Sequence, residues 1–122
     1  MAKTILIVDD SYSLRLVVKM TLEGAGYEVI AAADGQQALD MLDGRKIHLI
    51  LSDVNMPVMD GLTLLGHIKQ HPDYKFTPVI MLTTEASQDM KQRGQQAGAR
   101  GWLVKPFEPP QLLTTIGKLI LP

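Results

Sequence analysis

The sequence predicts an α/β fold in which five parallel strands form one sheet with helices on both faces. Five short apolar runs alternate with five segments whose apolar residues recur at helical spacing. The runs lack the polar alternation of a half-exposed strand, so we expect them to be buried on both faces. Strict alternation of strand and helix favours parallel pairing with a helical crossover after each strand. We expect one domain over residues 1–122.

Each expected strand is followed by turn residues and then by a helix. The strands are expected at 4–8, 27–32, 49–51, 78–82 and 101–104. The first helix is capped by Ser11 or Ser13 and stops at Gly24 or Gly26. Its apolar positions are Leu14, Val17, Val18 and Leu22.

The later helices have their own boundary signals. A short second helix follows Asp34 and ends by Gly44, and a third must stop before Pro72. The fourth spans 87–97 and is rich in glutamine, whereas the fifth begins near Pro109. The apolar face of the fifth helix is formed by Leu112, Leu113, Ile116, Leu119 and Ile120.

Composition is typical of a globular domain and argues against several functions. Hydrophobic residues make up 46% of the chain, charged residues 20%, and the formal net charge is −1. No global field would therefore attract nucleic acid or an anionic membrane. The chain has no cysteine, which excludes disulfides and thiol chemistry. No apolar run approaches membrane-spanning length. We expect a cytoplasmic protein that binds neither nucleic acid nor membrane.

Polar residues directly follow four of the five strands. Right-handed crossovers and five strands favour the doubly wound order 2-1-3-4-5, which is the flavodoxin-like arrangement. This order brings the carboxyl ends of strands 1, 3, 4 and 5 to one edge of the sheet. The residues expected to converge there are Asp9, Asp10, Asp53, Thr83 and Lys105.

Three carboxylates at one edge repel one another, by roughly 3 kcal/mol for two charges about 5 Å apart. A cation would relieve this repulsion, and ligands that are all oxygen favour a hard ion, Mg²⁺ or Ca²⁺. Lys105 adds a positive charge and Thr83 a hydroxyl. Together these groups form a receptor for a phosphoryl group on a carboxylate. The pattern alone does not decide which carboxylate is the nucleophile.

The same residues allow other interpretations. Asp9 and Asp10 also suit the start of a helix, without a cation. The acidic turn after the first strand argues against a dinucleotide or P-loop site, which needs glycines or hydroxyls there. A docking module that is never phosphorylated would show a damaged acid cluster or lack Lys105. A phosphatase of the haloacid dehalogenase type would need a second Asp two positions after the first-strand Asp, and Ser11 stands there.

Four motifs resemble the signature blocks of bacterial response-regulator receiver domains. They are 8–10 (Val-Asp-Asp), 53–61 (Asp-Val-Asn-Met-Pro-Val-Met-Asp-Gly), 81–84 (Met-Leu-Thr-Thr) and 104–107 (Val-Lys-Pro-Phe). The match covers essentially the whole chain, in the right order and at the right spacings. It is most similar to the single-domain, CheY-like chemotaxis regulators.

The resemblance implies a phosphorelay protein, not an enzyme in the usual sense, that assists its own phosphorylation and dephosphorylation. Asp53 would accept the phosphoryl group from a phosphohistidine on a sensor histidine kinase. Asp9, Asp10, Asp53 and the backbone carbonyl of Asn55 would hold Mg²⁺. Asn55 and Glu85 would tune dephosphorylation, and they match the fast-turnover chemotaxis pattern.

The resemblance also assigns the switch residues. Thr83 would bond the phosphoryl oxygen and move toward it, and Lys105 would pair with the phosphoryl group, with a cis bond before Pro106. Trp102 stands where the family's switch aromatic, usually Tyr or Phe, stands. Thr84 is larger than the small residue often found there, so it is expected to slow phosphoryl access.

The output would be a separate protein, with the flagellar motor switch as the first candidate. The family's usual output face comprises helix 4, strand 5 and helix 5. In this chain it carries Lys91, Arg93, Arg100 and Trp102. This face is equally consistent with an ordinary solvated basic surface. A phosphatase is a possible further partner, and the alternative function is a phosphate sink or adaptor in a phosphorelay outside chemotaxis.

Overall fold

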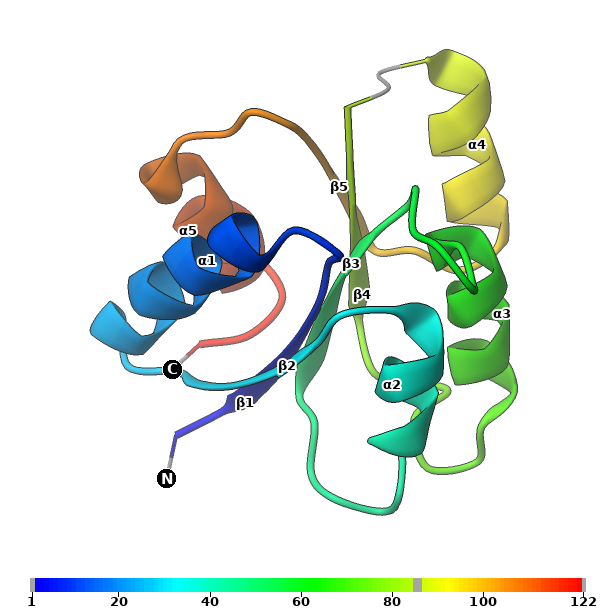
Figure 1. Cartoon of the computed structure of the whole chain (residues 1–122), viewed down its shortest axis with the longest axis horizontal. Helices are drawn as coiled ribbons and strands as arrows, with labels where there is room; N and C mark the ends of the chain where they lie inside the picture. The colour runs from blue at the N-terminus through cyan, green and yellow to red at the C-terminus, as the bar shows by residue number, and fades with distance from the viewer. Residues whose placement is uncertain (1, 85–86, 122) are drawn as a thin grey trace.

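A five-stranded parallel sheet runs through the middle of the molecule (Figure 1). The computed structural model describes residues 2–84 and 87–121. Its strand order, β2-β1-β3-β4-β5, confirms the predicted topology. The strands are β1 (Thr4–Val8), β2 (Glu28–Ala32), β3 (Leu49–Asp53), β4 (Val79–Thr83) and β5 (Gly101–Val104).

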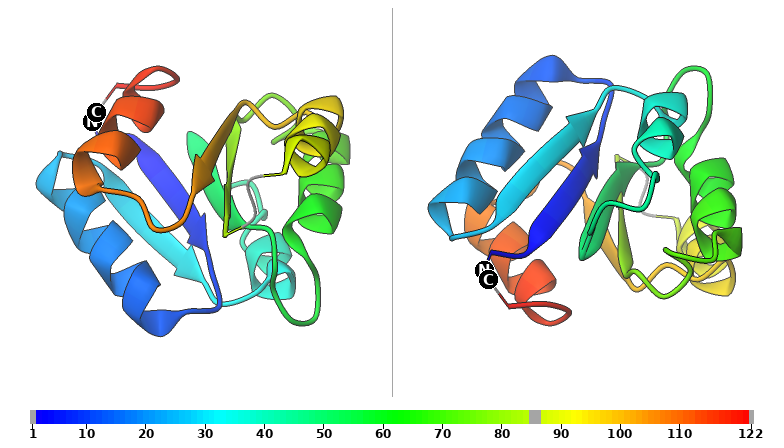
Figure 2. Two further views of the ribbon diagram at one scale, coloured as in Figure 1. Left: turned by 90° about the horizontal axis from the view of Figure 1, so that it is seen from above. Right: turned by 90° about the horizontal axis from the view of Figure 1, so that it is seen from below.

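Helices cover both faces of the sheet, with α1 and α5 on one side and α2, α3 and α4 on the other (Figures 1 and 2). Their bounds are α1 (Tyr12–Gly24), α2 (Gly35–Asp40), α3 (Gly61–Gln70), α4 (Gln88–Gln96) and α5 (Pro109–Gly117). Four helices begin at a side-chain cap that accepts a backbone N–H three residues on. These caps are Ser11, Asp34, Asp60 and Ser87.

Two helices end earlier than the apolar pattern predicts. α2 stops at Asp40, and Leu42 donates its N–H to the carbonyl of Leu39, which tightens the chain into a turn. α5 stops at Gly117, and Leu119 donates in the same way to Ile116. Leu42 remains buried and Leu119 packs against the core. The apolar positions were therefore predicted correctly. The predicted helix ends were too late because a tight turn can also direct these side chains into the core.

The core consists of two apolar layers, one on each face of the sheet. Ile5 and Ile7 of β1 belong to the layer under α1 and α5, whereas Leu6 and Val8 belong to the layer under α2 and α3. This alternation follows from the two-residue side-chain period of a strand. All five residues of β3 are buried, as expected for a strand covered on both faces. Within 2–84 and 87–121, no helix is long and apolar enough to cross a membrane.

Strand register brings the polar strand ends to one edge. Val8 pairs with Ser52 across β1 and β3, and Asp53 pairs with Leu82 across β3 and β4. Thr83 pairs with Val104 across β4 and β5. Asp9, Asp53, Thr83 and Lys105 therefore leave their strands at nearly the same level, which sets up the site described next.

Candidate functional site: an acidic cluster at the carboxyl edge of the sheet

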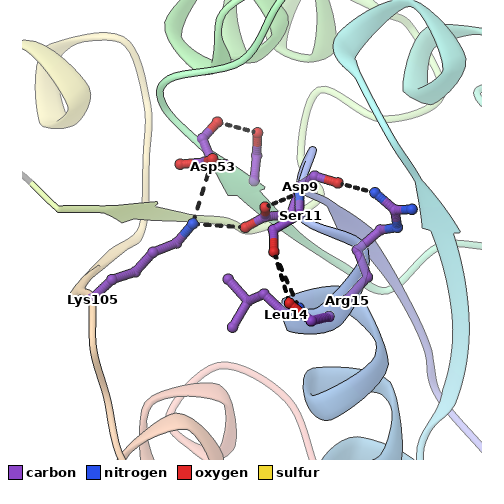
Figure 3. A network of polar contacts seen from close by, with 8 residues as sticks. Asp9, Ser11, Leu14, Arg15, Asp53 and Lys105 are labelled. Carbon is purple, nitrogen blue, oxygen red and sulfur yellow. Dashed lines mark hydrogen bonds and ion pairs between the residues drawn. The ribbon is translucent and has the colours of Figure 1, made fainter.

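Asp9 lies directly after β1 and is almost fully buried, at 1% exposure. Its Oδ1 accepts the backbone N–H of Ser11 at 2.9 Å. Its carbonyl oxygen accepts a hydrogen bond from the guanidinium of Arg15, one turn into α1 (Figure 3). Backbone and side chain of Asp9 are thus both fixed, which leaves Oδ2 directed at the centre of the site.

Lys105 reaches into the same centre from the end of β5 (Figure 3). Its Nζ lies 2.7 Å from Asp9 Oδ2 and 3.4 Å from Asp53 Oδ2. The peptide bond between Lys105 and Pro106 is cis, in agreement with the sequence-based expectation. One ammonium group therefore bridges the two buried carboxylates.

Asp53 ends β3 and is 6% exposed. Burial raises the pKa of its carboxyl because the charged form loses water. The nearby Lys105 opposes this rise in pKa, whereas the negative charges of Asp9 and Asp10 add to it. The surroundings of Asp53 thus destabilise its charged form. Perturbed carboxylates of this kind are typical of functional sites.

Asp10 completes a cluster with the two buried acids. One carboxylate oxygen from each of Asp9, Asp10 and Asp53 can be chosen such that all three lie within 4.8 Å of one another. Asp10 is exposed, so the cluster opens to solvent on its side. Two of the three carboxylates are buried and the third is solvated. This combination fits a hard cation that retains water ligands. The arrangement confirms the predicted convergence of these acids.

Thr83 ends β4, next to β3, and is fully buried. Its carbonyl accepts the backbone N–H of Lys105 at 2.7 Å, which ties the ends of β4 and β5 together. Asn55 lies in the exposed loop after β3. Glu85, the second residue expected to tune dephosphorylation, lies outside the described residues. Thr84 is exposed beside the site.

Gly61 has a part in the site that the sequence did not reveal. A Cβ at this position would collide with the carbonyl oxygen of Asp53 and lie 2.9 Å from the Cα of Val54. The N–H of Gly61 also donates to the carbonyl of Val54 at 2.8 Å. The start of α3 therefore packs directly against the backbone that presents Asp53, at a distance that only glycine allows.

Arg15 was also missed, because a single arginine on a helix gives no distinctive signal. A cap at Ser11, one of the two predicted positions, could have located it, since a cap fixes which residues of the first turn face back toward Asp9. Trp102, by contrast, lies away from this network, on β5 opposite Met81 and against α4.

Comparison with known proteins identifies the family to which this fold belongs. A model of the response regulator receiver domain matches residues 5–117. The chain belongs to this family of receiver domains. The match includes every residue of the acidic cluster, Lys105 and the cis peptide bond that follows it.

Solved receiver domains resemble this one closely. The chemotaxis protein CheY4 of Vibrio cholerae is 48% identical with a TM-score of 0.94, over 98% of this chain and 100% of that chain. The receiver domain of the sensor histidine kinase PA1611 of Pseudomonas aeruginosa PAO1 is 30% identical with a TM-score of 0.89, over 98% of each chain. That structure has a magnesium ion coordinated in its active-site cleft.

Among curated relatives, the transcriptional regulatory protein SrrA of Staphylococcus aureus is 34% identical over 120 residues. The match covers 98% of this receiver domain and 48% of SrrA. The chain therefore spans about half the length of the curated relatives that it matches.

Proposed function

We propose that this receiver domain accepts a phosphoryl group on Asp53 from the phosphohistidine of a sensor histidine kinase. The observation that carries the proposal is the position of the Asp53 carboxylate, at an open sheet edge between two further acids and the Nζ of Lys105. Two receiver domains of sensor histidine kinases among its structural neighbours support a place in a two-component system.

In the proposed transfer, a carboxylate oxygen of Asp53 attacks phosphorus while the phosphorus–nitrogen bond to the histidine breaks. The bonding electron pair leaves with the imidazole. Lys105 bridges Asp9 and Asp53 in this structure. In the transfer, its ammonium would also form an ion pair with the phosphoryl oxygens. Thr83, at the end of the neighbouring strand, would supply a hydroxyl to them. These donors are already held at the strand ends before the phosphoryl group arrives.

The acidic cluster fits Mg²⁺, which would be held by Asp9, Asp10, Asp53 and the backbone carbonyl of Asn55. When bound, Mg²⁺ supplies positive charge that offsets both the carboxylates and the incoming phosphoryl oxygens. The exposed position of Asp10 and Asn55 leaves room for water ligands, which Mg²⁺ usually keeps.

We further propose that residues 1–122 act as one receiver domain. Phosphorylation would alter the face formed by α4, β5 and α5, and Thr83 and Trp102 would be the switch residues. A separate output protein that prefers the altered face would then shift the population. The similarity to CheY4 supports chemotaxis and a flagellar motor switch protein as the output. A cytoplasmic location, and tuning of dephosphorylation by Asn55 and Glu85, belong to the same proposal.

The test is phosphorylation by acetyl phosphate in the presence of Mg²⁺, followed by peptide mass spectrometry. We expect one phosphate adduct on Asp53, none in Asp53→Asn, and a large reduction when EDTA replaces Mg²⁺. Asp73→Asn, at an exposed carboxylate in the loop after α3, is the matched control and should keep the adduct. An adduct that persists in Asp53→Asn would refute the assignment.

A further inference from the structure

Helix α4 has less apolar surface than the other long helices. Each of α1, α3 and α5 buries at least two large aliphatic side chains. All residues of α4 are described, and Gly94 is the only buried one among them. Its sequence, Gln-Asp-Met-Lys-Gln-Arg-Gly-Gln-Gln, has one apolar side chain, that of Met90, which is half-buried. A helix of this composition lacks the apolar stripe that normally holds a helix on a sheet.

The buried glycine of α4 lies against the indole of Trp102. A Cβ on Gly94 would lie 2.5 Å from Cζ3 and 3.1 Å from Cε3 of the indole. The six-membered ring of Trp102 therefore touches the helix backbone and fills the space where a side chain of α4 would stand. Trp102 also packs against the core layer under α2 and α3.

Shape, not hydrogen bonding, holds the indole in this place. Nε1 of Trp102 is buried and has no hydrogen-bond partner within the described part of the chain. A buried donor normally has a partner, so the ring gains its position from packing alone. The ring also forms part of the wall of a small surface hollow of about 120 Å³. The other residues that line the hollow are Lys91, Gln95, Ala99, Arg100 and Gly101.

We propose that the contact between Gly94 and Trp102 docks α4 on the sheet. Gly94 is a positioning residue that admits the indole, and the indole supplies from β5 the apolar surface that α4 lacks. The position of α4 and that of the ring are therefore coupled, since neither can move without the loss of their shared packing. This inference concerns the unphosphorylated chain and stands independently of the proposed function.

The single tryptophan of the chain makes the contact directly measurable. In Gly94→Ala we expect the tryptophan emission to shift to longer wavelength and its acrylamide quenching constant to rise at least two-fold. Backbone amides of α4 should exchange with solvent at least ten-fold faster, whereas those of α3 should keep their protection. The matched control is Gly66→Ala in α3, where an added Cβ meets nothing within 4 Å. It should change neither the emission nor the exchange of α4.

A smaller ring distinguishes a specific contact from general damage to the helix. In a Trp102→Phe background, Gly94→Ala should change the exchange of α4 by less than two-fold, because the outer ring atoms that it would strike are gone. Unchanged emission and exchange in Gly94→Ala would overturn the proposal. So would an equal loss of protection in the Trp102→Phe background, or a loss that extends through α3 and the sheet. All these measurements use protein without Mg²⁺ or phosphodonor, so they do not depend on phosphorylation of Asp53.

Discussion

Removal of the charge of Asp53 should stabilise the metal-free protein. Asp53→Asn keeps the shape of the side chain but removes a negative charge that is buried beside two other carboxylates. The change also removes the ion pair with Lys105 at 3.4 Å, which opposes the gain. The sign of the effect therefore depends on which of these contributions is larger.

The geometry allows the balance to be worked out. With carboxylate oxygens within 4.8 Å of one another, each of the two neighbouring acids raises the energy of charged Asp53 by about 3.5 kcal/mol at an effective dielectric constant of about 20. The ammonium of Lys105 lowers it by about 5 kcal/mol on the same basis. The remaining repulsion is about 2 kcal/mol. Solvent screens the part due to the exposed Asp10, whereas burial of the Asp53 charge adds to the repulsion. We expect Asp53→Asn to raise the free energy of unfolding by about 1–2 kcal/mol at pH 7.

The gain should depend on pH in a definite direction. The pKa of Asp53 is raised by folding, so between its unfolded and folded pKa the native state binds more protons than the unfolded state. Wild-type stability therefore falls as pH rises through this window. Asparagine has no such titration. The advantage of Asp53→Asn should be complete at neutral pH and should be lost progressively below about pH 4, as the unfolded aspartate also becomes protonated.

Urea denaturation in EDTA, monitored by far-ultraviolet circular dichroism at pH 7 and near pH 3.5, measures the effect. Asp73→Asn, at an exposed site, should stay within about 0.5 kcal/mol of wild type. Addition of Mg²⁺ should then favour the wild type, by about 2.7 kcal/mol at a hundred times its dissociation constant. A clear loss of metal-free stability in Asp53→Asn, or a gain that is the same at both pH values, would refute the crowded-carboxylate reasoning.

Three further changes test other parts of the structure. Lys105→Met should lower the metal-free free energy of unfolding by about 3 kcal/mol, because it leaves two carboxylates without their shared ammonium. An unchanged urea midpoint would contradict the bridging role. Gly61→Ala should cost more than about 2 kcal/mol and slow phosphorylation by acetyl phosphate, whereas Gly66→Ala should change stability by no more than about 1 kcal/mol. Hydrogen bonds from Arg45 lower the pKa of Asp43 to about 2. In Arg45→Ala, a carboxyl titration followed by NMR should show that the pKa of Asp43 returns toward its usual value. An unchanged pKa of Asp43 would show that the pair does not persist in solution.

The arrangement of the strands and their polar ends was predictable because both depend on short-range patterns. An apolar run that closes on Asp53 or Lys105 fixes where a buried strand ends, and strict alternation with helices fixes the side of the sheet at which those ends meet. The acidic cluster follows from these two facts. Its prediction therefore required no knowledge of side-chain conformation, and the carboxylate positions confirm it.

The sequence did not reveal the contacts that glycines make with neighbouring helices or strands. In the sequence Gly61 is only the glycine that begins α3 after the Asp60 cap, and its close approach to Asp53 exists only once α3 has packed. Gly94 looks like a weak point of α4 until the indole of Trp102 is placed against it. Periodicity predicts which face of an element is buried, but it does not predict which neighbour a glycine must admit.

The apolar core also decides how accurately the acids are placed. Because β1, β3 and β4 are buried on both faces, a slip of one residue would exchange the two faces of a strand and would draw Asp53 into the place of Ser52. That move would take a carboxylate away from Lys105 and from solvent, at a cost of several kcal/mol. The same packing that stabilises the sheet thus excludes the registers that would disperse the cluster. Apolar residues well away from the site are therefore as necessary to its geometry as the acids themselves.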